Sequence, residues 1–393
     1  MEIKIYQGAS EIGGVITGVS CGAARILIDF GRPLTGPAAA GGRDQVRIDE
    51  PYDALIFTHY HRDHTDLIEY VAENVPLYMG KTAKELFLAA QRHKDPDSPA
   101  VKRIEGIIPY EDGVPFEAGG MRITPILTDH SAFDSYMLLI EGDGRRVLHT
   151  GDFRLHGLKG NLVLPSLSPL TGTVDAMITE GTNLSFKAPV TVSEYHLADA
   201  SGLLMQRFPY VFVQCGALDI DRLAVFHMAS QGRRFCCDPY QMSLLEIVRR
   251  SGSAGSCLAY SFDRARVWMD GGKEPDTEPF CMAVRNGSAF RKIIEPYAKN
   301  APEKTLFIYS MSEGYLKEHL SDVQKLTKGL RYAVKIHTSG HGSAEALRLA
   351  AETVSPKLLI PVHTKKEEGL EACFPNQRIL RLADGESCEV FPT

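Results

Sequence analysis

Three histidines and an aspartate fall within six residues of this chain, and this cluster constrains the fold more than any other feature. The H-x-H-x-D-H motif comprises His59, His61, Asp63 and His64, and it follows an apolar run, residues 54–57, that is typical of a buried strand. Protonated imidazoles repel one another and neutral ones need partners, so such clustering is costly unless something is bound there. A histidine-rich surface loop is the alternative. We interpret the motif as part of a metal site at the end of a strand.

Two further residues follow strand patterns downstream and extend the ligand set. His130 follows the run 121–127, and Asp152 follows the run 145–150. Either residue alone would more often be structural, but beside the first motif each becomes a candidate ligand. Imidazole and carboxylate are the ligand types of catalytic zinc sites, which keep an open position for water. Iron or manganese would also fit, because affinity and metal supply together decide occupancy.

The composition is that of an ordinary globular chain and excludes several classes of protein. With 393 residues, 44% of them hydrophobic, the chain can bury a large core in two domains or in one domain with an insertion. The eight cysteines are scattered, which favours reduced thiols. Neither a secretory signal nor an apolar run of membrane-spanning length occurs, so we expect a cytoplasmic protein with no membrane partner. The net charge of −6 gives no overall attraction to nucleic acid.

The pattern of secondary structure changes near residue 184. Before it, short β-rich runs are broken by Gly, Pro or Asp, with helical patterns at 66–72 and 82–90, which predicts stacked sheets with helices outside. After it, strand and helix patterns alternate, as in a small βαβ domain with a parallel sheet. From residue 333 onward the pattern returns to strand, helix, strand and a hairpin-like end. The sequence therefore predicts an α/β protein.

The order of these residues resembles the sequential motifs of the metallo-β-lactamase superfamily. Asp29 ends a strand pattern, the histidine motif follows it, and His130 and Asp152 come next. The resemblance implies an αββα sandwich that holds two Zn²⁺ ions bridged by Asp152. It assigns one zinc to His59, His61 and His130, and the other to Asp63, His64 and a later histidine. Asp29 would orient the metal loop from behind the ligands, the alternative being a strand-end aspartate that caps a turn.

Three later segments resemble motifs A, B and C of the β-CASP branch, which includes ribonuclease J-like enzymes. Residues 178–183 resemble motif A, with Glu180 as its acidic residue, and residues 337–343 resemble motif B, with His341 as its functional histidine. Residues 359–363 resemble motif C, and the resemblance implies that His363 is the remaining ligand of the second zinc. The branch carries its β-CASP domain between motifs A and B. The resemblance implies a metallo-β-lactamase domain of residues 1–183 and 332–393, with an inserted β-CASP domain of residues 184–331.

The resemblance also implies an activity, that of a two-zinc phosphodiesterase acting as a nuclease with metal-bound hydroxide as nucleophile. RNA is favoured over DNA, because His363 stands where DNA-repair members of the branch tend to have Val. Exonuclease and endonuclease action both stay open, and Mn²⁺ is an alternative to Zn²⁺. The branch alone suggests a homodimer. The implied catalytic side chains are Asp63, His341 and Glu180, and those that contact substrate phosphate are Ser339, His341 and Arg222.

The sequence also leaves alternatives open. Near Arg222, Gly216 and Ala217 stand where relatives often have hydroxyl groups, so Arg222 paired with Asp219 or Asp221 on a solvated helix face is a structural alternative. The metal site alone does not choose between carbonyl and phosphoryl chemistry, so a hydrolase of a small-molecule ester, thioester or lactone is the second function. The third is a catalytically inactive binding protein, which the complete ligand set argues against.

Overall fold

The chain forms two compact units. The computed structural model describes residues 1–34, 48, 50–187, 189–251, 257–268, 278–365 and 369–390. Residues 1–189 and 340–393 make one unit, here called the discontinuous unit, and residues 190–339 make the other, the inserted unit. Each is described by itself below.

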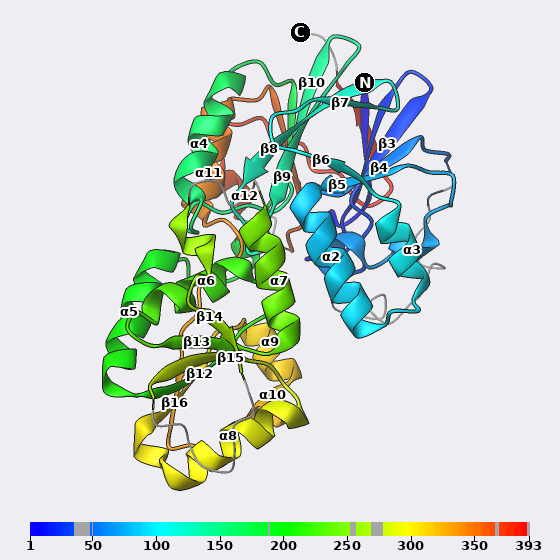
Figure 1. The fold of residues 1–393 in the computed structure, drawn as a ribbon. Helices are drawn as coiled ribbons and strands as arrows, with labels where there is room; N and C mark the ends of the chain where they lie inside the picture. Colours follow the sequence, from blue (N-terminus) through cyan, green and yellow to red (C-terminus); the bar gives the residue numbers. More distant parts are fainter. Residues whose placement is uncertain are drawn as a thin grey trace. The chain divides into compact units, whose positions relative to one another are not determined.

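Two mixed sheets form the discontinuous unit (Figure 1), in the strand orders β19-β1-β2-β3-β4-β5-β6 and β18-β11-β10-β9-β8-β7. The strands of the first sheet are β1 (Glu2–Gln7), β2 (Ile16–Cys21), β3 (Ala24–Ile28), β4 (Ala54–Ile56), β5 (Leu77–Gly80), β6 (Ile108–Tyr110) and β19 (Ser387–Glu389). The strands of the second are β7 (Phe116–Ala118), β8 (Met121–Thr128), β9 (Ser135–Gly142), β10 (Arg145–His149), β11 (Ala176–Glu180) and β18 (Leu358–Val362).

Helices cover the outer faces of these sheets (Figure 1). On the first sheet α2 packs against β5 and β6, and on the second α4 and α11 pack against each other and against β8 and β11. The helices of this unit are α1 (Arg62–Thr65), α2 (Lys81–Lys94), α3 (Pro99–Glu105), α4 (Gly160–Leu167), α11 (Ala344–Val354) and α12 (Leu370–Cys373). The layers are therefore helix, sheet, sheet and helix.

Strand β9 shows how the sequence specifies these layers. Successive side chains of a strand point to opposite faces of its sheet. Leu138 and Ile140 lie in the core between the two sheets, whereas Met137 and Leu139 lie in the core beneath α4 and α11. Because both faces of the strand are covered, its pattern is a continuous apolar run rather than an alternation.

The carboxyl ends of several strands meet at one edge of the sandwich. In the second sheet β10, β11 and β18 are mutually parallel, and β8 runs in the same direction because β9 is antiparallel to both β8 and β10. In the first sheet β3 and β4 are parallel. Residues that follow these six strands are thus brought together although they are far apart in sequence, as in other α/β sheets whose sites lie at strand carboxyl ends.

The inserted unit contains an all-parallel sheet in the order β14-β13-β15-β12-β16-β17. Its strands are β12 (Tyr210–Gln214), β13 (Arg234–Cys237), β14 (Ala265–Val267), β15 (Phe280–Val284), β16 (Thr305–Tyr309) and β17 (Tyr332–Lys335). Its helices are α5 (Glu194–Arg207), α6 (Ile220–Ala229), α7 (Pro239–Arg250), α8 (Ser288–Asn300), α9 (Glu313–Glu318) and α10 (Leu320–Leu326). The central strands β12, β15 and β16 are buried throughout, which is the pattern of a parallel sheet covered on both faces.

This architecture agrees with the predicted α/β class, a sandwich interrupted by a parallel βαβ domain. The second predicted junction needs correction, because residues 332–339 belong to the inserted unit rather than to the sandwich. Strand β17 pairs with β16 and so extends the parallel sheet. At the first junction the inserted unit begins at Val190, a few residues after the predicted start at 184. Among the described residues no helix has the length and hydropathy that crossing a bilayer requires.

Candidate metal centre

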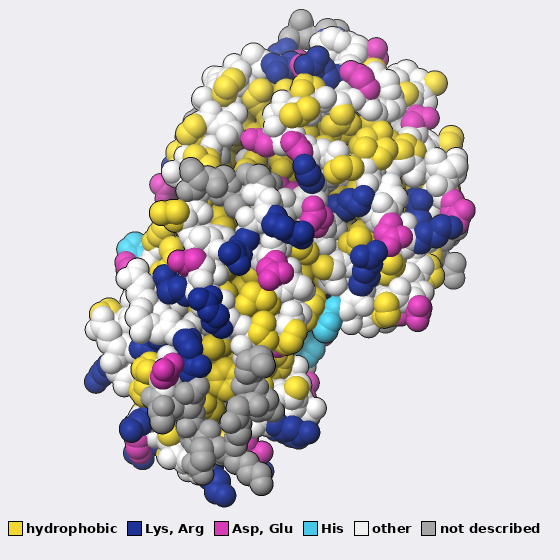
Figure 2. Space-filling model, in the orientation of Figure 1, with side chains coloured by type: hydrophobic (Ala, Val, Ile, Leu, Met, Phe, Trp, Pro, Cys, Tyr) yellow, Lys and Arg dark blue, Asp and Glu magenta, His cyan; other side chains and the backbone are white. Residues whose placement is uncertain are grey.

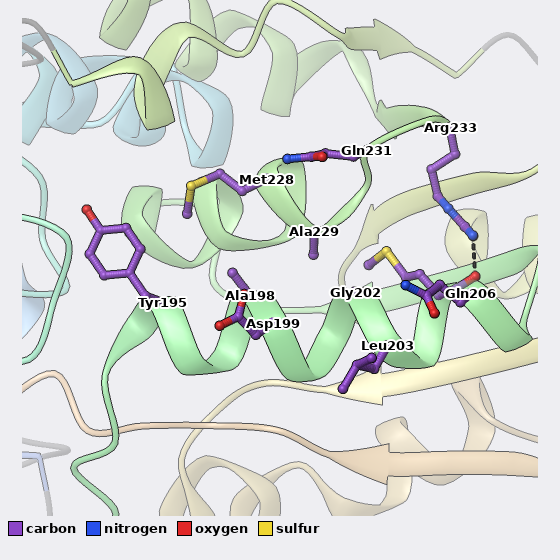
Figure 3. A pocket seen from close by; sticks show the side chains of 11 residues that line it. Tyr195, Ala198, Asp199, Gly202, Leu203, Gln206, Met228, Ala229, Gln231 and Arg233 are labelled. Carbon is purple, nitrogen blue, oxygen red and sulfur yellow. Dashed lines mark hydrogen bonds between the residues drawn. The ribbon is translucent and has the colours of Figure 1, made fainter.

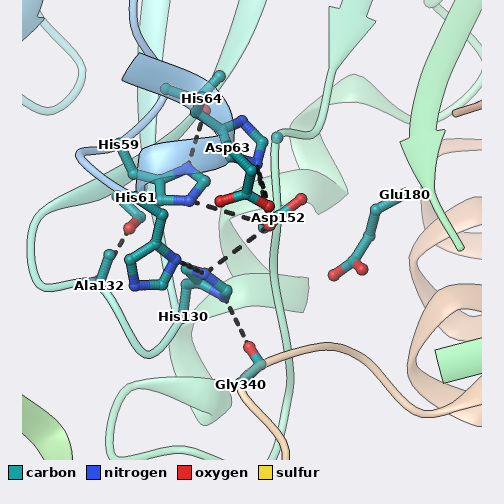
Figure 4. Close-up of polar contacts among 12 residues, drawn as sticks. His59, His61, Asp63, His64, His130, Ala132, Asp152, Glu180 and Gly340 are labelled. Atoms are coloured by element: carbon teal, nitrogen blue, oxygen red, sulfur yellow. Dashed lines mark hydrogen bonds and ion pairs between the residues drawn. The ribbon is translucent and has the colours of Figure 1, made fainter. Parts of the chain in front are cut away.

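Histidine and carboxylate side chains converge at the strand-end edge of the discontinuous unit. Figure 4 shows the imidazoles of the predicted motif gathered around Asp152, with Glu180 on another side. The residues and their elements are Asp29 after β3, His59 after β4, Asp63 and His64 in α1, His130 after β8, Asp152 after β10, Glu180 at the end of β11, and His363 after β18. Asp29 and His363 both have left-handed backbone conformations, with φ of 59° and 56°. Such strain in residues other than glycine clusters at functional sites.

Three imidazoles make the first group of candidate ligands. One nitrogen from each of His59, His61 and His130 lies within 4.8 Å of the others. The Nδ1 atom of His61 is 3.1 Å from the Nε2 atom of His130. The structure thus brings together the three histidines that the sequence assigned to one zinc.

A second group lies beside the first and shares Asp152 with it. Asp63, His64 and His363 place ligand atoms within 4.8 Å of one another, and Nε2 of His363 is 3.2 Å from Oδ2 of Asp63. Oδ2 of Asp152 lies 3.2 Å from Nε2 of His64 and 3.8 Å from Nε2 of His59. Asp152 therefore stands between the two groups, where a bridging carboxylate would be.

The hydrogen bonds behind His59 and His64 fix which nitrogen of each ring faces the centre. Nδ1 of His64 is 2.7 Å from Oδ2 of Asp29, a carboxylate that can only accept, so this nitrogen carries the proton. The Thr58 hydroxyl donates its single proton to the same carboxylate at 2.8 Å and therefore accepts from Nδ1 of His59 at 3.0 Å. In both rings Nε2 is left with its lone pair toward the centre, and Asp29 orients the two histidines from behind.

His130 and His363 are fixed in the same way. Nδ1 of His130 donates to the Gly340 carbonyl at 2.6 Å, so its Nε2 carries the lone pair that faces His61. Nδ1 of His363 lies 2.5 Å from the Thr182 hydroxyl, whose own proton points to the His363 carbonyl. Thr58 and Thr182 were not predicted from the sequence. Thr58 adjoins the histidine motif, but the pairing of Thr182 with His363 spans 181 residues and leaves no local pattern.

Unpartnered atoms at the centre show that the cluster suits cations. Nε2 of His59, Nε2 of His64 and Oδ2 of Asp152 are buried and form no hydrogen bond of good geometry among the described residues, although His64 and Asp152 lie 3.2 Å apart as an ion pair. Buried polar atoms are normally satisfied, and leaving one unsatisfied costs about 1–3 kcal/mol. Three such atoms converging on one point are explained if they are ligands. Imidazole nitrogens and carboxylate oxygens in two adjacent groups fit a binuclear site for divalent metals.

The protonation preferences of the cluster fit the same interpretation. Burial and neighbouring imidazoles hold the pKa values of His59 and His130 well below the usual range, and burial lowers the pKa of His61 to about 4. These rings are neutral at pH 7, as ligands must be. Burial alone would also lower the pKa of His64, but the charges of Asp152, Asp29 and Asp63 hold it well above the usual value. The carboxylates thus require a compensating positive charge, which a metal ion supplies as well as a proton does.

Glu180 and His341 form a pair beside the candidate ligands. Nδ1 of His341 donates to Oε2 of Glu180 at 2.9 Å, and it lies 3.6 Å from Oδ2 of Asp152. The other oxygen of Glu180 accepts from the backbone N–H groups of Phe153 and Gly342. Burial opposes protonation of His341, but the charges of Glu180 and Asp152 raise its pKa to about 9. The His341 side chain is 22% exposed, so a substrate could reach it.

A buried ion pair braces the loops that carry His130 and Asp152. Arg154 and Asp129 are both fully buried and lie 3.1 Å apart, and the Arg154 backbone N–H donates to the Asp129 carbonyl at 2.7 Å. Each residue is one or two positions from a candidate ligand. The pair therefore fixes the spacing of the loops after β8 and β10, a role that the sequence did not reveal.

The structure corrects the assignment of Arg222 to substrate phosphate. Its side chain is 1% exposed, and its guanidinium forms two hydrogen bonds with the buried carboxylate of Glu194, at 3.0 and 2.9 Å. It also donates to the Ser310 hydroxyl and to the Thr338 carbonyl. The solvated helix face offered as the alternative is wrong as well, because the residue is buried. Ser339 is the last residue of the inserted unit, and its backbone N–H donates to Val190, so its contact with phosphate stays a prediction.

Comparison with known proteins agrees with this fold and site. Residues 24–231, just over half of the chain, match the model of the beta-lactamase superfamily domain. The chain is 24% identical to ribonuclease J of Helicobacter pylori, in an alignment that covers all of this chain and 61% of the relative. It is 21% identical to ribonuclease J of Mycoplasma genitalium, in an alignment that covers 92% of this chain and 67% of the relative. A crystal structure of an Enterococcus faecalis protein of unknown function superposes with a TM-score of 0.78 and 20% identity, covering 98% of this chain and 99% of that one.

The fold and the His/Asp cluster together define a metallo-hydrolase, and the chain belongs to the metallo-β-lactamase superfamily. Within that superfamily its whole length is distantly similar to ribonuclease J. It spans 61% of the length of the Helicobacter pylori relative.

Proposed function

We propose that this protein is a metal-dependent phosphodiesterase that cuts RNA. The observation that carries the proposal is the pair of adjacent ligand groups that share Asp152, with the His341–Glu180 pair beside them. A hydrolase of carbonyl substrates could use the same ligands, so the choice of RNA draws on the named relatives, which are ribonucleases J. Because these relatives are distant and longer than this chain, the substrate is the part of the proposal that most needs a test.

The ligand sets of the two metals follow from the two groups. His59, His61 and His130 would hold one ion, Asp63, His64 and His363 the other, and Asp152 would join them. Zn²⁺ suits the mixed imidazole and carboxylate donors, and Mn²⁺ is the alternative. Two such ions would activate water as a nucleophile and stabilise the attacking and leaving oxygens of an in-line displacement.

The protein's own groups supply proton transfer and orientation. Glu180 accepts the Nδ1–H of His341 and so fixes the orientation of that ring. The other ring nitrogen, Nε2, can then donate a proton to the leaving oxygen or stabilise negative charge on the phosphoryl group. Asn183 steadies the same loop, because its side-chain amide donates to the carbonyls of His341 and Gly342 at 2.7 and 3.0 Å.

The test is cleavage of end-labelled single-stranded RNA and its DNA counterpart, with Zn²⁺ or Mn²⁺ added. The wild type should cut RNA in a metal-dependent way, and the variant Asp63→Ala with His64→Ala should lose this activity. Product lengths would separate exonuclease from endonuclease action. If neither nucleic acid is cut while the protein hydrolyses a small ester, thioester or lactone, the phosphodiesterase proposal is wrong.

Two further variants make the assay specific to the site. Arg62→Ala lies in the same helix as the double variant, but its side chain is 78% exposed and pairs with Asp66, so cleavage should be unchanged. His341→Gln leaves the seven candidate ligands in place. It should retain metal and cut RNA about 10²–10⁴-fold more slowly, the usual contribution of a positioned acid or base.

A further inference from the structure

The two units differ in charge, and the difference bears on how a polyanion could be held. The discontinuous unit has 24 Lys and Arg against 33 Asp and Glu, whereas the inserted unit has 19 against 16. The net charge of the unit that carries the candidate metal centre thus gives no overall attraction to a nucleic acid. A phosphodiester chain longer than the reacting group needs positive charge elsewhere, because neutralised phosphates supply most of the affinity for nucleic acid.

A groove on the inserted unit concentrates such charge. It has a volume of about 610 Å³ and lies between α8 and the end of α10. Its walls carry Arg291 and Lys299 from α8, Lys325 from α10, and Lys328 from the turn that follows. In Figure 2, Lys and Arg side chains are visible at the edge of the inserted unit where Figure 1 places α8 and α10.

Most of the positive charge in this groove is not neutralised by the protein. Arg291, Lys299 and Lys328 form no ion pair or side-chain hydrogen bond within the part of the chain that the structure describes, and only Lys325 is paired, with Asp322 at 3.0 Å. Of the described residues that line the groove, one is acidic, Glu295. Like charges held close together are unfavourable. The groove therefore attracts an anion along its length.

The second hollow of the inserted unit provides a contrast (Figure 3). It lies between α5 and residues 228–233, and its volume is similar, about 590 Å³. Its one cation, Arg233, donates to the carbonyls of Phe208 and Pro209, and the carboxylate of Asp199 lines the same hollow. Size alone thus does not distinguish the α8–α10 groove. Its uncompensated charge does.

We infer that the α8–α10 groove binds the phosphate backbone of the RNA substrate, on a unit that carries none of the candidate metal ligands. The inference rests on the proposed function. Among the described residues that line the groove none is aromatic, so these residues offer no surface for base stacking, and they would recognise backbone charge rather than sequence. It would raise the affinity for RNA and leave the chemistry at the metal centre unchanged.

The test measures binding and not cleavage, by titrating a fluorescent 20-nucleotide single-stranded RNA in EDTA at several salt concentrations. The groove variant is Arg291→Gln, Lys299→Gln, Lys325→Gln and Lys328→Gln. Each phosphate contact contributes about 0.7 to the slope of log affinity against log salt for a single strand, so losing most of four contacts should lower the slope by about 2–3 and weaken binding at low salt at least about tenfold.

A matched control removes equal charge from the other unit. The variant Lys81→Gln, Arg92→Gln, Lys102→Gln and Arg348→Gln changes four exposed cations that are already paired with Glu111, Glu105, Glu73 and Glu352. It should bind RNA with nearly the wild-type salt slope. Hydrolysis of bis(p-nitrophenyl) phosphate with Zn²⁺ or Mn²⁺ should be equal in wild type and both variants, because this substrate has a single phosphate and none left over for the groove to bind.

The outcomes separate the groove from the proposed function. If wild type cuts RNA but the groove variant binds it as the control does, the groove inference is overturned and the phosphodiesterase stands. If the groove variant alone loses RNA binding but wild type cuts no RNA, the groove stands as a nucleic-acid site and the proposed function fails. Binding of vesicles containing phosphoinositides, but not of RNA, through the same four residues would overturn the inference in favour of a lipid headgroup.

Discussion

Each unit buries a cluster of charged side chains, and the two clusters are organised in opposite ways. In the discontinuous unit, buried atoms of His59, His64 and Asp152 face one another (Figure 4) and form no hydrogen bond of good geometry among the described residues. In the inserted unit, the buried guanidinium of Arg222 donates to the carboxylate of Glu194 and to three further oxygen atoms. The first cluster is incomplete by itself, and the second is complete.

The difference is a physical criterion for telling a binding site from a structural network. A fully satisfied network holds the fold and has no capacity left for a ligand. A cluster whose lone pairs converge unsatisfied is stable only when something else supplies the missing charge. By this criterion the sandwich holds a metal centre, and the Arg222 network joins α6 to α5 and to the segments after β16 and β17.

The largest effect that we expect is a loss of stability in the variant Arg222→Leu, which tests whether the Arg222 network is structural. This change leaves the Glu194 carboxylate buried without its partner, which typically costs about 3–5 kcal/mol. We expect the free energy of unfolding in urea to fall by about that amount. The zinc content of the folded protein should stay at the wild-type value, because none of the candidate ligands belongs to this network.

The double variant Arg222→Leu with Glu194→Leu is the control for that prediction. Because both charges are removed together, much of the stability should return. A stable Arg222→Leu protein with a raised KM for RNA would contradict the structural role and restore the phosphate-binding role.

A smaller effect is expected from Thr182→Val, which tests the other side of the comparison. The variant keeps the shape of the side chain but removes the acceptor for Nδ1–H of His363, so that ring loses its fixed orientation. Loss of such a partner behind a ligand typically weakens metal binding about 10–100-fold. Zn²⁺ affinity measured by competition with a chelator should fall by this factor.

Thr182→Ser is the matched variant, because it retains the hydroxyl group. It should bind Zn²⁺ nearly as tightly as wild type. If the Thr182→Val and Thr182→Ser variants bind Zn²⁺ equally well, the hydroxyl group does not orient His363 for metal binding.

The sequence predicted the parts of this structure that local patterns encode. The stacked sheets and the parallel sheet follow from strand and helix periodicities. The ligands of the first motif, His130 and Asp152 could be named because they follow strand patterns, whereas His363 was named only from the resemblance to motif C. The hydroxyl of Thr182 and the brace between Asp129 and Arg154 could not be predicted, because these contacts join distant segments and have no periodicity. Arg222 was misjudged for the same reason, since its partner Glu194 lies on another helix.

The most direct test of the central claim is the number of metal ions bound per chain, measured by mass spectrometry of the metal content after dialysis against Zn²⁺. The account predicts two zinc ions per chain in the wild type. It predicts at most one in Asp152→Ala, the variant that removes the shared carboxylate, with an unchanged circular dichroism spectrum. No bound metal in the wild type, or two ions retained in a folded Asp152→Ala protein, would contradict a binuclear centre built around Asp152.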